Sequence, residues 1–181
     1  MKNLFCYLLV FLSLNLLGQK KILDHPDFDI WSSIQRSNIS SSGDYVMYSL
    51  VKGEKDSELK IKDDKGNLIF KHDRSENNRF TYDSRFVLFK IKAWKDSIIE
   101  MKRRKVKKNK MPMDTLAIYN IEENTLYKIP NIKSYKIPEK WSTYIAYHYD
   151  DKKSEKNNDT IKTKKAFKKP SSINGLSLIH I

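Results

Sequence analysis

Residues 39–48, ISSSGDYVMY, consist of a polar turn followed by an alternating strand, and residues 80–89, FTYDSRFVLF, repeat that pattern. In each copy, small and polar residues typical of turns precede a run rich in aromatic and β-branched side chains, as expected of a strand. Tyr45 and Phe86 hold corresponding places and lie 41 positions apart. A four-stranded β-propeller blade repeats at roughly 40–45 residues. The interval therefore predicts consecutive propeller blades.

A third, looser copy of the strand pattern, WSTYIAY, spans residues 141–147. Between the copies, residues 59–70 and 116–129 each hold two short apolar strands around a polar turn, which predicts β-hairpins. No long amphipathic helix interrupts this order. The sequence thus predicts an all-β chain that forms a partial β-propeller of about three blades over residues 39–175. Three blades are too few to close a ring.

The repeat is broken by a Lys-rich insertion between Lys92 and Asp114, where the alternation is lost. This insertion explains why Phe86 and Tyr144 lie 58 positions apart instead of 41. We expect either a protruding β-hairpin arm or a short exposed helix. The chain carries a formal net charge of +13, and seven of its cations form a candidate surface contact in this insertion: Lys102, Arg103, Arg104, Lys105, Lys107, Lys108 and Lys110.

This run of cations could bind phosphate nonspecifically, but a solvated face is the simpler interpretation. Proteins that bind single-stranded nucleic acids add aromatic side chains on which bases stack. None lies between Lys95 and Lys110. We therefore expect no nucleic-acid partner. A second Lys-rich tract, residues 150–170, is expected to be a loop between blades.

Residues 1–18 have the layout of a secretory signal peptide, with Lys2 before an apolar run that ends at small Gly18. Cleavage is expected between Gly18 and Gln19, and an uncleaved membrane anchor is the alternative. No membrane association is expected once the signal is removed. Cys6 is the single cysteine and lies inside this segment, so the mature chain would have no disulfide, thiol catalyst or cysteine-based zinc site.

Residues 19–38 are interpreted as an N-terminal segment that precedes the blades. Its apolar residues have spacings compatible with one or two turns of helix, for which Asp29 would be the N-cap: Phe28, Ile30, Trp31 and Ile34. Strands are expected to begin near Ile39.

The sequence offers no catalytic group, metal site or cofactor site. A serine nucleophile elbow needs Gly-x-Ser-x-Gly, and the nearest match, GLSLI at 175–179, lacks the second glycine. His72 and Asp73 are adjacent, so on an extended chain they would point in opposite directions, and a solvated turn is the simpler interpretation. Neither His25 nor His148 has the spacing of a metal ligand relative to other candidate residues.

Two further features have simple structural interpretations. Residues 63–67, DDKGN, resemble part of a calcium loop but lack the Glu of its twelfth position, so a hairpin turn is expected. Trp94, Trp141 and the aromatic residues of 135–149 could form a carbohydrate platform, but aromatic blade cores explain them more simply.

From about residue 22 to residue 170, the chain resembles the N-terminal propeller of secreted bacterial peptidases of the prolyl oligopeptidase family of serine peptidases. The resemblance rests on LDHPDFDIWSSIQRSNISSSGDYVMYSL, on FTYDSRFVLFKIKAWKD before the Lys-rich insertion, and on MPMDTLAIYNIEENTLYKIPNIKSYKIPEKWSTYIAYHYD. The last of these opens with a Met-Pro-x-Asp-[Ser/Thr]-Leu turn, residues 111–116, which this branch of the family also shows.

The resemblance implies a propeller that caps a C-terminal α/β-hydrolase domain, in which a Ser, an Asp and a His cleave short peptides that the propeller admits. No triad position can be assigned to this chain, so the fragment would be inactive alone, and its peptide substrates would be reached through the missing catalytic domain. The protein would be periplasmic or extracellular. The competing hypothesis is a secreted, non-enzymatic propeller that docks an acidic partner through the cations of 102–110.

The last residues, 176–181, read LSLIHI, which matches a translated sequencing adapter. We expect the natural protein to continue beyond Asn174 or Gly175, and a genuine terminal strand is the alternative.

Overall fold

The computed structural model describes Asp24, Asp27 and residues 31–149, 172–173 and 176–180. The predicted signal peptide with its cleavage site at Gly18 and Gln19, the proposed N-cap Asp29, and the Lys-rich tract of 150–170 lie outside the described residues.

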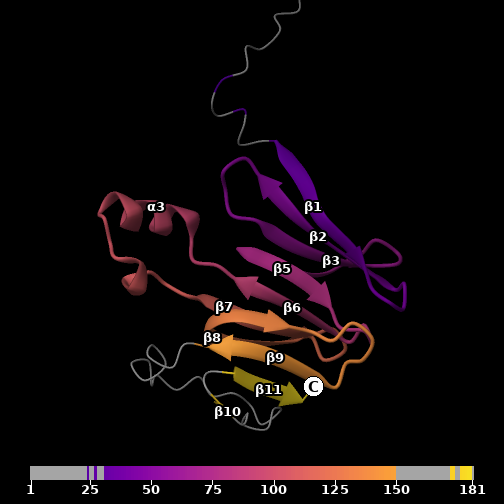
Figure 1. Ribbon diagram of the computed structural model, residues 1–181. Helices are drawn as coiled ribbons and strands as arrows, with labels where there is room; N and C mark the ends of the chain where they lie inside the picture. The colour runs from indigo at the N-terminus through magenta and orange to yellow at the C-terminus, as the bar shows by residue number, and fades with distance from the viewer. Residues whose placement is uncertain (1–23, 25–26, 28–30, 150–171, 174–175, 181) are drawn as a thin grey trace, which may run out of the picture.

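The first four strands form one antiparallel sheet, which we call blade 1, in the order β1-β2-β3-β4 (Figure 1). Their bounds are Ser32–Ile39 for β1, Tyr45–Lys52 for β2, Glu58–Asp63 for β3 and Leu68–Asp73 for β4. The turn between β3 and β4 is the expected hairpin. Asn67 donates from its backbone N–H to Asp63 Oδ1 at 2.7 Å, and Gly66 has a φ of 84°. A positive φ of this kind favours glycine.

The remaining strands form a second antiparallel sheet in the order β10-β11-β9-β8-β7-β6-β5. Their bounds are Ser75–Phe80 for β5, Phe86–Ile91 for β6, Asp114–Asn120 for β7, Thr125–Lys136 for β8, Tyr144–Tyr149 for β9, Ser172–Ile173 for β10 and Leu176–His180 for β11. The long strand β8 pairs first with β7 and then, from Ile132 on, with β9. Its first part completes blade 2 with β5, β6 and β7. Its last part begins blade 3, which continues with β9, β11 and β10. The predicted all-β partial propeller is confirmed.

The 41-residue repeat is present in the hydrogen bonds of the turns as well as in the sequence. Ser40 N–H donates to the Tyr45 carbonyl at 2.9 Å, and Thr81 N–H donates to the Phe86 carbonyl at the same distance. Gly43 and Ser84 hold the same place in the two turns, with φ values of 85° and 63°. Both turns therefore follow one backbone path.

Successive turns are joined to one another by a second repeated contact. Ser42 N–H donates to Ser84 Oγ at 3.1 Å, and Asp83 N–H donates to Ser142 Oγ at 2.8 Å. Ser42 and Asp83 are 41 positions apart. Each turn thus donates a backbone hydrogen bond to the hydroxyl of a serine two positions before the next blade's second strand.

The third copy is offset by one residue from the predicted alignment. The first strand of each blade contains a β-bulge, and the pairs just before the bulges are Gln35 with Ser49, Glu76 with Lys90 and Ile132 with Tyr149. In the second strands, the residues four positions before Ser49, Lys90 and Tyr149 are Tyr45, Phe86 and Ile145. The residue that corresponds to Phe86 is therefore Ile145, which is fully buried, and not Tyr144, which is 42% exposed.

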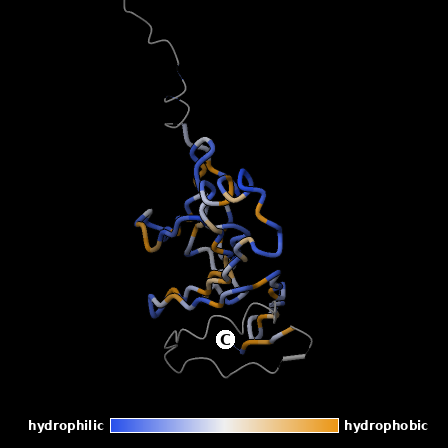
Figure 2. The backbone as a smooth tube through the Cα atoms, turned by 90° about the vertical axis from the view of Figure 1, so that its left-hand side faces the viewer, coloured by the Kyte–Doolittle hydropathy of each residue, from blue (hydrophilic) through white to orange (hydrophobic). Residues whose placement is uncertain are grey.

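The buried side chains gather in two clusters, one between each pair of neighbouring blades. The first cluster joins blade 1 to blade 2: Met47, Leu59, Ile61, Val87, Phe89, Ile91, Ala117, Tyr119 and Ile121. The second joins the other face of blade 2 to blade 3: Phe86, Leu88, Leu116, Ile118, Ile132, Ile145, Tyr147 and Ile179. Figure 2 shows hydrophobic stretches along the strands, with hydrophilic segments between them.

Two predictions for the N-terminal part are wrong. Ile34 lies in β1, so the helical interpretation fails at that residue, and the strands begin at Ser32 instead of near Ile39. All eight residues of β1 are exposed, and β1 is an edge strand that pairs with β2 alone. A strand without a buried face has no alternating pattern to reveal it.

The Lys-rich insertion forms a short exposed helix, one of the two predicted alternatives. Helix α3, Lys95–Arg103, and the 3₁₀ turn η2, Lys108–Lys110, contain no buried residue. Figure 1 shows α3 standing away from the sheets. This insertion connects β6 to β7, where a much shorter segment connects β2 to β3 in blade 1.

The interpretation of the tryptophans as blade cores is wrong. Trp94 and Trp141 are 51% and 52% exposed, whereas Tyr147, from the same aromatic group, is buried as expected. Trp94 precedes α3, and its ring lies under the Arg74 guanidinium, with Cζ 4.3 Å from the ring centroid.

The turn at Gly43 supplies a test of the repeated backbone path. A Cβ at this position would meet no atom within 4 Å, so the effect of Gly43→Ala comes from its φ alone. We predict that Gly43→Ala destabilises blade 1 by about 1–2 kcal/mol, the usual cost of left-handed backbone for an L-residue. Hydrogen exchange at the amides of β2 in the complete natural protein measures this loss. Ser41→Ala, an exposed change in the same turn, is the control, and an equal effect of both variants would contradict the prediction.

Candidate functional site

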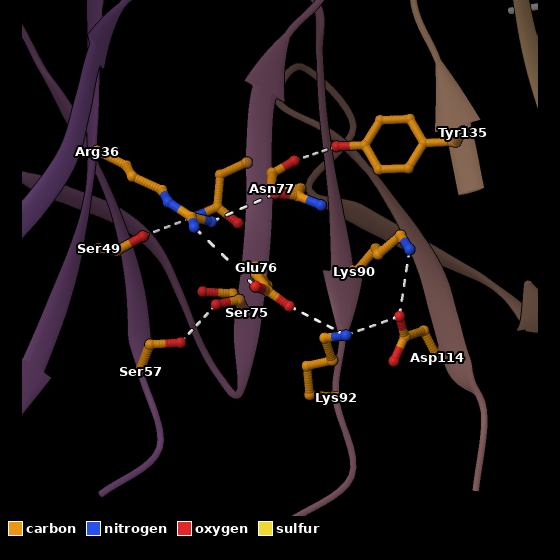
Figure 3. Close-up of polar contacts among 11 residues, drawn as sticks. Arg36, Ser49, Ser57, Ser75, Glu76, Asn77, Lys90, Lys92, Asp114 and Tyr135 are labelled. Carbon is orange, nitrogen blue, oxygen red and sulfur yellow. Dashed lines mark hydrogen bonds and ion pairs between the residues drawn. The ribbon is translucent and has the colours of Figure 1, made fainter. Parts of the chain in front are cut away.

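Five side chains of alternating charge form a ladder that crosses the first two blades and reaches the third (Figure 3). Arg36 Nη2 lies 4.0 Å from Glu76 Oε1, and Glu76 Oε2 lies 3.1 Å from Lys92 Nζ. Asp114 Oδ2 then accepts hydrogen bonds from Lys92 Nζ at 2.9 Å and from Lys90 Nζ at 3.2 Å. We call these residues the charge ladder.

The ladder is held by elements from all three blades. Arg36 is in β1, Glu76 in β5, Lys90 in β6 and Asp114 at the start of β7. Lys90 Nζ also donates to the Lys133 carbonyl in the last part of β8 at 2.7 Å. The ladder therefore ties blade 1 to blade 2 and blade 2 to blade 3.

Burial increases along the ladder. The Arg36 side chain is 54% exposed, that of Asp114 19% and that of Lys90 11%. Burial lowers the pKa of Lys92, but its hydrogen bonds to Asp114 and Glu76 outweigh this effect, and the pKa is raised overall. Because two partly buried lysines share one carboxylate, Asp114 is the member on which the others depend.

Further hydrogen bonds run beside the ladder and join the first strands of successive blades (Figure 3). Arg36 Nη1 donates to Asn77 Oδ1 at 3.3 Å, and the Tyr135 hydroxyl donates to the Asn77 carbonyl. Burial raises the pKa of Tyr135, so its hydroxyl remains a donor. Asn78 Nδ2 donates to Ser49 Oγ at 2.7 Å in the buried space between β5 and β2. The first strands of the three blades are therefore neighbours.

A cavity of about 850 Å³ lies beside the ladder. Arg36, Glu76, Lys92 and Asp114 line it on the side of the sheets, and residues of α3, among them Lys95 and Ile99, line it on the other. Its size is within the range of small-molecule and peptide side-chain sites. Its mixed charges suit a polar ligand, since each charged group can form hydrogen bonds to it.

The described residues contain no arrangement for metal binding or membrane crossing. No cluster of three or more His, Cys, Asp or Glu side chains there could hold a metal ion. No helix in the same part of the chain is long and apolar enough to span a bilayer.

The seven cations predicted as a surface contact are all exposed, from Lys102 in α3 to Lys110 in η2. Arg104 Nε lies 2.8 Å from Glu100 Oε1, one helical turn earlier. Lys102 also lines the cavity beside the ladder, whereas the other six are not among its lining residues. Their role as a docking surface stays a prediction.

His72 does not lie in a solvated turn, which corrects the sequence interpretation. It is in β4, half-buried, with its ring 5.2 Å from that of Phe89 and its Nδ1 2.6 Å from the Asp73 carbonyl oxygen. Burial lowers its pKa, and the positive charges of Lys128 and Arg74 act in the same direction. Ser177 lies buried in β11 and not on a strand-to-helix turn, as expected of a residue outside a nucleophile elbow.

Sequence reasoning missed the charge ladder, although one signal was present. Lys90 interrupts an otherwise apolar run, FVLFKI, and a lysine within a buried strand needs a partner. Asp114, in the Met-Pro-x-Asp-Thr-Leu motif, is that partner, and nothing in the motif indicates the pairing. No pattern in the sequence connects Arg36 or Glu76 to either residue.

No family model matches the sequence, and no curated protein matches it. Among solved structures, the chain is similar to an uncomplexed acylaminoacyl peptidase of Pyrococcus horikoshii, at 12% identity and a TM-score of 0.48 over 71% of this chain and 19% of the other. It is also similar to the β-propeller domain of the Trilobed protease from Pyrococcus furiosus, at 14% identity and a TM-score of 0.46 over 66% and 35%. A structure from a study of two prolyl endopeptidases gives 15% identity and a TM-score of 0.47 over 74% and 21%. The chain thus spans about a third or less of each of these proteins.

The first test of the ladder is the removal of its central charge. Asp114→Asn keeps the shape and an acceptor oxygen but leaves two lysines without their shared carboxylate. We predict that β6 and β7 become less stable by about 2 kcal/mol, within the range for a largely buried charged hydrogen bond. Hydrogen exchange at the amides of these strands in the complete natural protein measures the change.

Glu76→Gln is the matched control, because Glu76 is 39% exposed and its ion pairs are screened by water. Such pairs contribute about 0.5 kcal/mol. An effect of Glu76→Gln equal to that of Asp114→Asn would refute the assignment of Asp114 as the central member.

The lowered pKa of His72 predicts acid sensitivity. Between its folded pKa and its unfolded value of 6.5, the unfolded chain binds more protons at this site, so the free energy of unfolding decreases as the pH falls through that window. Above this pH window, His72 contributes no pH dependence to the free energy of unfolding. Urea unfolding of the propeller, followed by aromatic fluorescence between pH 8 and pH 5, measures the loss. His72→Phe keeps an aromatic ring and should reduce the dependence; an unchanged pH profile would contradict the account.

Proposed function

We propose that the chain is the N-terminal propeller part of a secreted serine peptidase of the prolyl oligopeptidase family, which hydrolyses oligopeptides. The observation that carries the proposal is that the described parts of the three stretches of the family resemblance follow one another through the partial propeller, the first in blade 1, the second in blade 2 and the third in blades 2 and 3. The Met-Pro-x-Asp-Thr-Leu turn in the third stretch supplies Asp114, on which the charge ladder depends. The predicted signal peptide supports a periplasmic or extracellular location.

In this function the propeller acts as a filter. Its first strands β1, β5 and the last part of β8 are neighbours, and the contacts of Arg36, Asn77 and Tyr135 tie them together. Contacts of this kind would keep the passage beside these strands narrow, so that short or unfolded peptides pass and folded proteins do not. The catalytic Ser, Asp and His would belong to a domain that these residues do not include.

A test compares the complete natural protein with residues 19–175 alone. We predict that the complete protein cleaves short peptides, spares a folded protein that contains the same sequence, and reacts with a serine-directed fluorophosphonate probe. Residues 19–175 should neither cleave nor react. They should also aggregate or stay partly unfolded, because an incomplete propeller leaves strand edges unpaired. A sharp, reversible melting transition of 19–175 would contradict the last point.

The second candidate function is a secreted, non-enzymatic propeller that docks an acidic partner. The exposure of all seven cations on an insertion without buried residues favours it. A complete protein that neither cleaves peptides nor reacts with the probe would support this candidate. Its binding to an acidic protein should then be lost when Lys105, Lys107 and Lys108 are replaced by Glu.

A further inference from the structure

Arg74 is the single residue between β4 and β5, where the chain passes from blade 1 to blade 2. Its N–H donates to the Ser57 carbonyl at 2.6 Å, and its carbonyl accepts from Lys92 N–H at 2.9 Å. Its φ is 61°, in the left-handed region. Asn131 follows the corresponding pairing of β7 with β8 and has a φ of 60°. Asparagine is common in this conformation, whereas arginine is not.

The side chain of Arg74 gives a reason for an arginine at this strained position. Its guanidinium stacks on Trp94, and its Nε is buried without a hydrogen-bond acceptor in the described part of the chain. A buried donor of this kind is unfavourable unless an acceptor reaches it. Strained backbone often persists where a side chain serves a site. An ordered water or a ligand group would satisfy this donor.

A cavity of about 330 Å³ adjoins Arg74. Lys92, Lys128 and Thr115 also line it, together with apolar residues that include Pro112 and Met113, and no carboxylate is among the described residues of its wall. Lys92 Nζ is engaged by Asp114 and Glu76. Arg74 and Lys128 are therefore the cations available to a ligand, and Thr115 adds a hydroxyl.

The same two cations, Arg74 and Lys128, also act on His72. Burial is the main cause of its lowered pKa, and the charges of Lys128 and Arg74 lower the pKa further, against the opposing charge of Asp73. Asp73 does not line the cavity. An anion in the cavity would meet the cations of Arg74 and Lys128 and the hydroxyl of Thr115, and no carboxylate is among the lining residues.

We propose that this cavity, the Arg74 pocket, binds a carboxylate carried by a peptide. The carboxylate accepts a hydrogen bond from the Thr115 hydroxyl and lies near the Arg74 guanidinium and Lys128, while the apolar wall contacts the aliphatic part of the same residue. The choice of a peptide rests on the proposed function; the preference for a carboxylate does not.

The experiment measures binding of fluorescein-labelled hexapeptides to the complete natural protein by anisotropy, with a fluorophosphonate present to prevent hydrolysis. One set of peptides has a free or an amidated C-terminus, and another has Glu or Gln inside an amidated peptide. These arms separate a terminal carboxylate from a side-chain carboxylate. We expect at least one carboxylate form to bind about tenfold more tightly than its neutral partner, as a charged hydrogen bond would give.

Two variants locate the effect. Arg74→Asn keeps a residue that suits the left-handed backbone, and Lys128→Gln changes an exposed side chain and should not affect folding. Both should reduce the preference for the carboxylate, Arg74→Asn to about equal affinities. Lys65→Gln, which removes one charge from the turn at the far end of β4, is the control and should leave the preference unchanged.

Equal binding of charged and neutral peptides, or a preference that survives in both variants, would overturn the Arg74 pocket. These results differ from a failure of the proposed function. A protein without a fluorophosphonate-reactive serine that still prefers the carboxylate through Arg74 would refute the peptidase and support the pocket. A protein that cleaves peptides but binds charged and neutral peptides equally would support the peptidase and refute the Arg74 pocket.

Discussion

Blade 2 buries side chains on both of its faces, and the arrangement of the other two blades depends on this double burial. All six residues of β6 and five of the seven in β7 are buried. One face of these strands packs on Met47, Leu59 and Ile61 of blade 1, and the other packs on Ile145, Tyr147 and Ile179 of blade 3. A single blade cannot bury its apolar faces alone, so its stability is shared with its neighbours.

Burial of this kind also explains the charge ladder. Lys90 lies within the buried run of β6, where an unpaired ammonium would be strongly unfavourable. Asp114 and the Lys133 carbonyl satisfy it from β7 and β8, and Lys92 extends the contact to Glu76 in β5. The apolar clusters hold the blades face to face but do not fix how far one blade is shifted along the next. The hydrogen bonds and ion pairs along the first strands fix that position, because hydrogen bonds require particular distances and angles.

The sequence predicted those parts of the fold that two blades share. The turns at Gly43 and Ser84 repeat because the same five-residue connection joins the first two strands in blades 1 and 2, and this repeat revealed the period. The third copy was misaligned because seven residues join β8 to β9. Strand β1 was missed because none of its residues is buried. Apart from the lysine in the apolar run of β6, the sequence holds no sign of the ladder, since its members come from residues 36 to 114 and meet only once the blades are packed.

The most direct measurement of the account is the genomic sequence beyond the codon for Gly175. If the chain is the start of a propeller-capped peptidase, the reading frame continues through further blades to a Gly-x-Ser-x-Gly elbow, followed by an Asp and a His in the order of α/β-hydrolases. A frame that closes without such an elbow would contradict the peptidase account. The propeller would then be a binding module, with the cations of 102–110 as its first candidate surface.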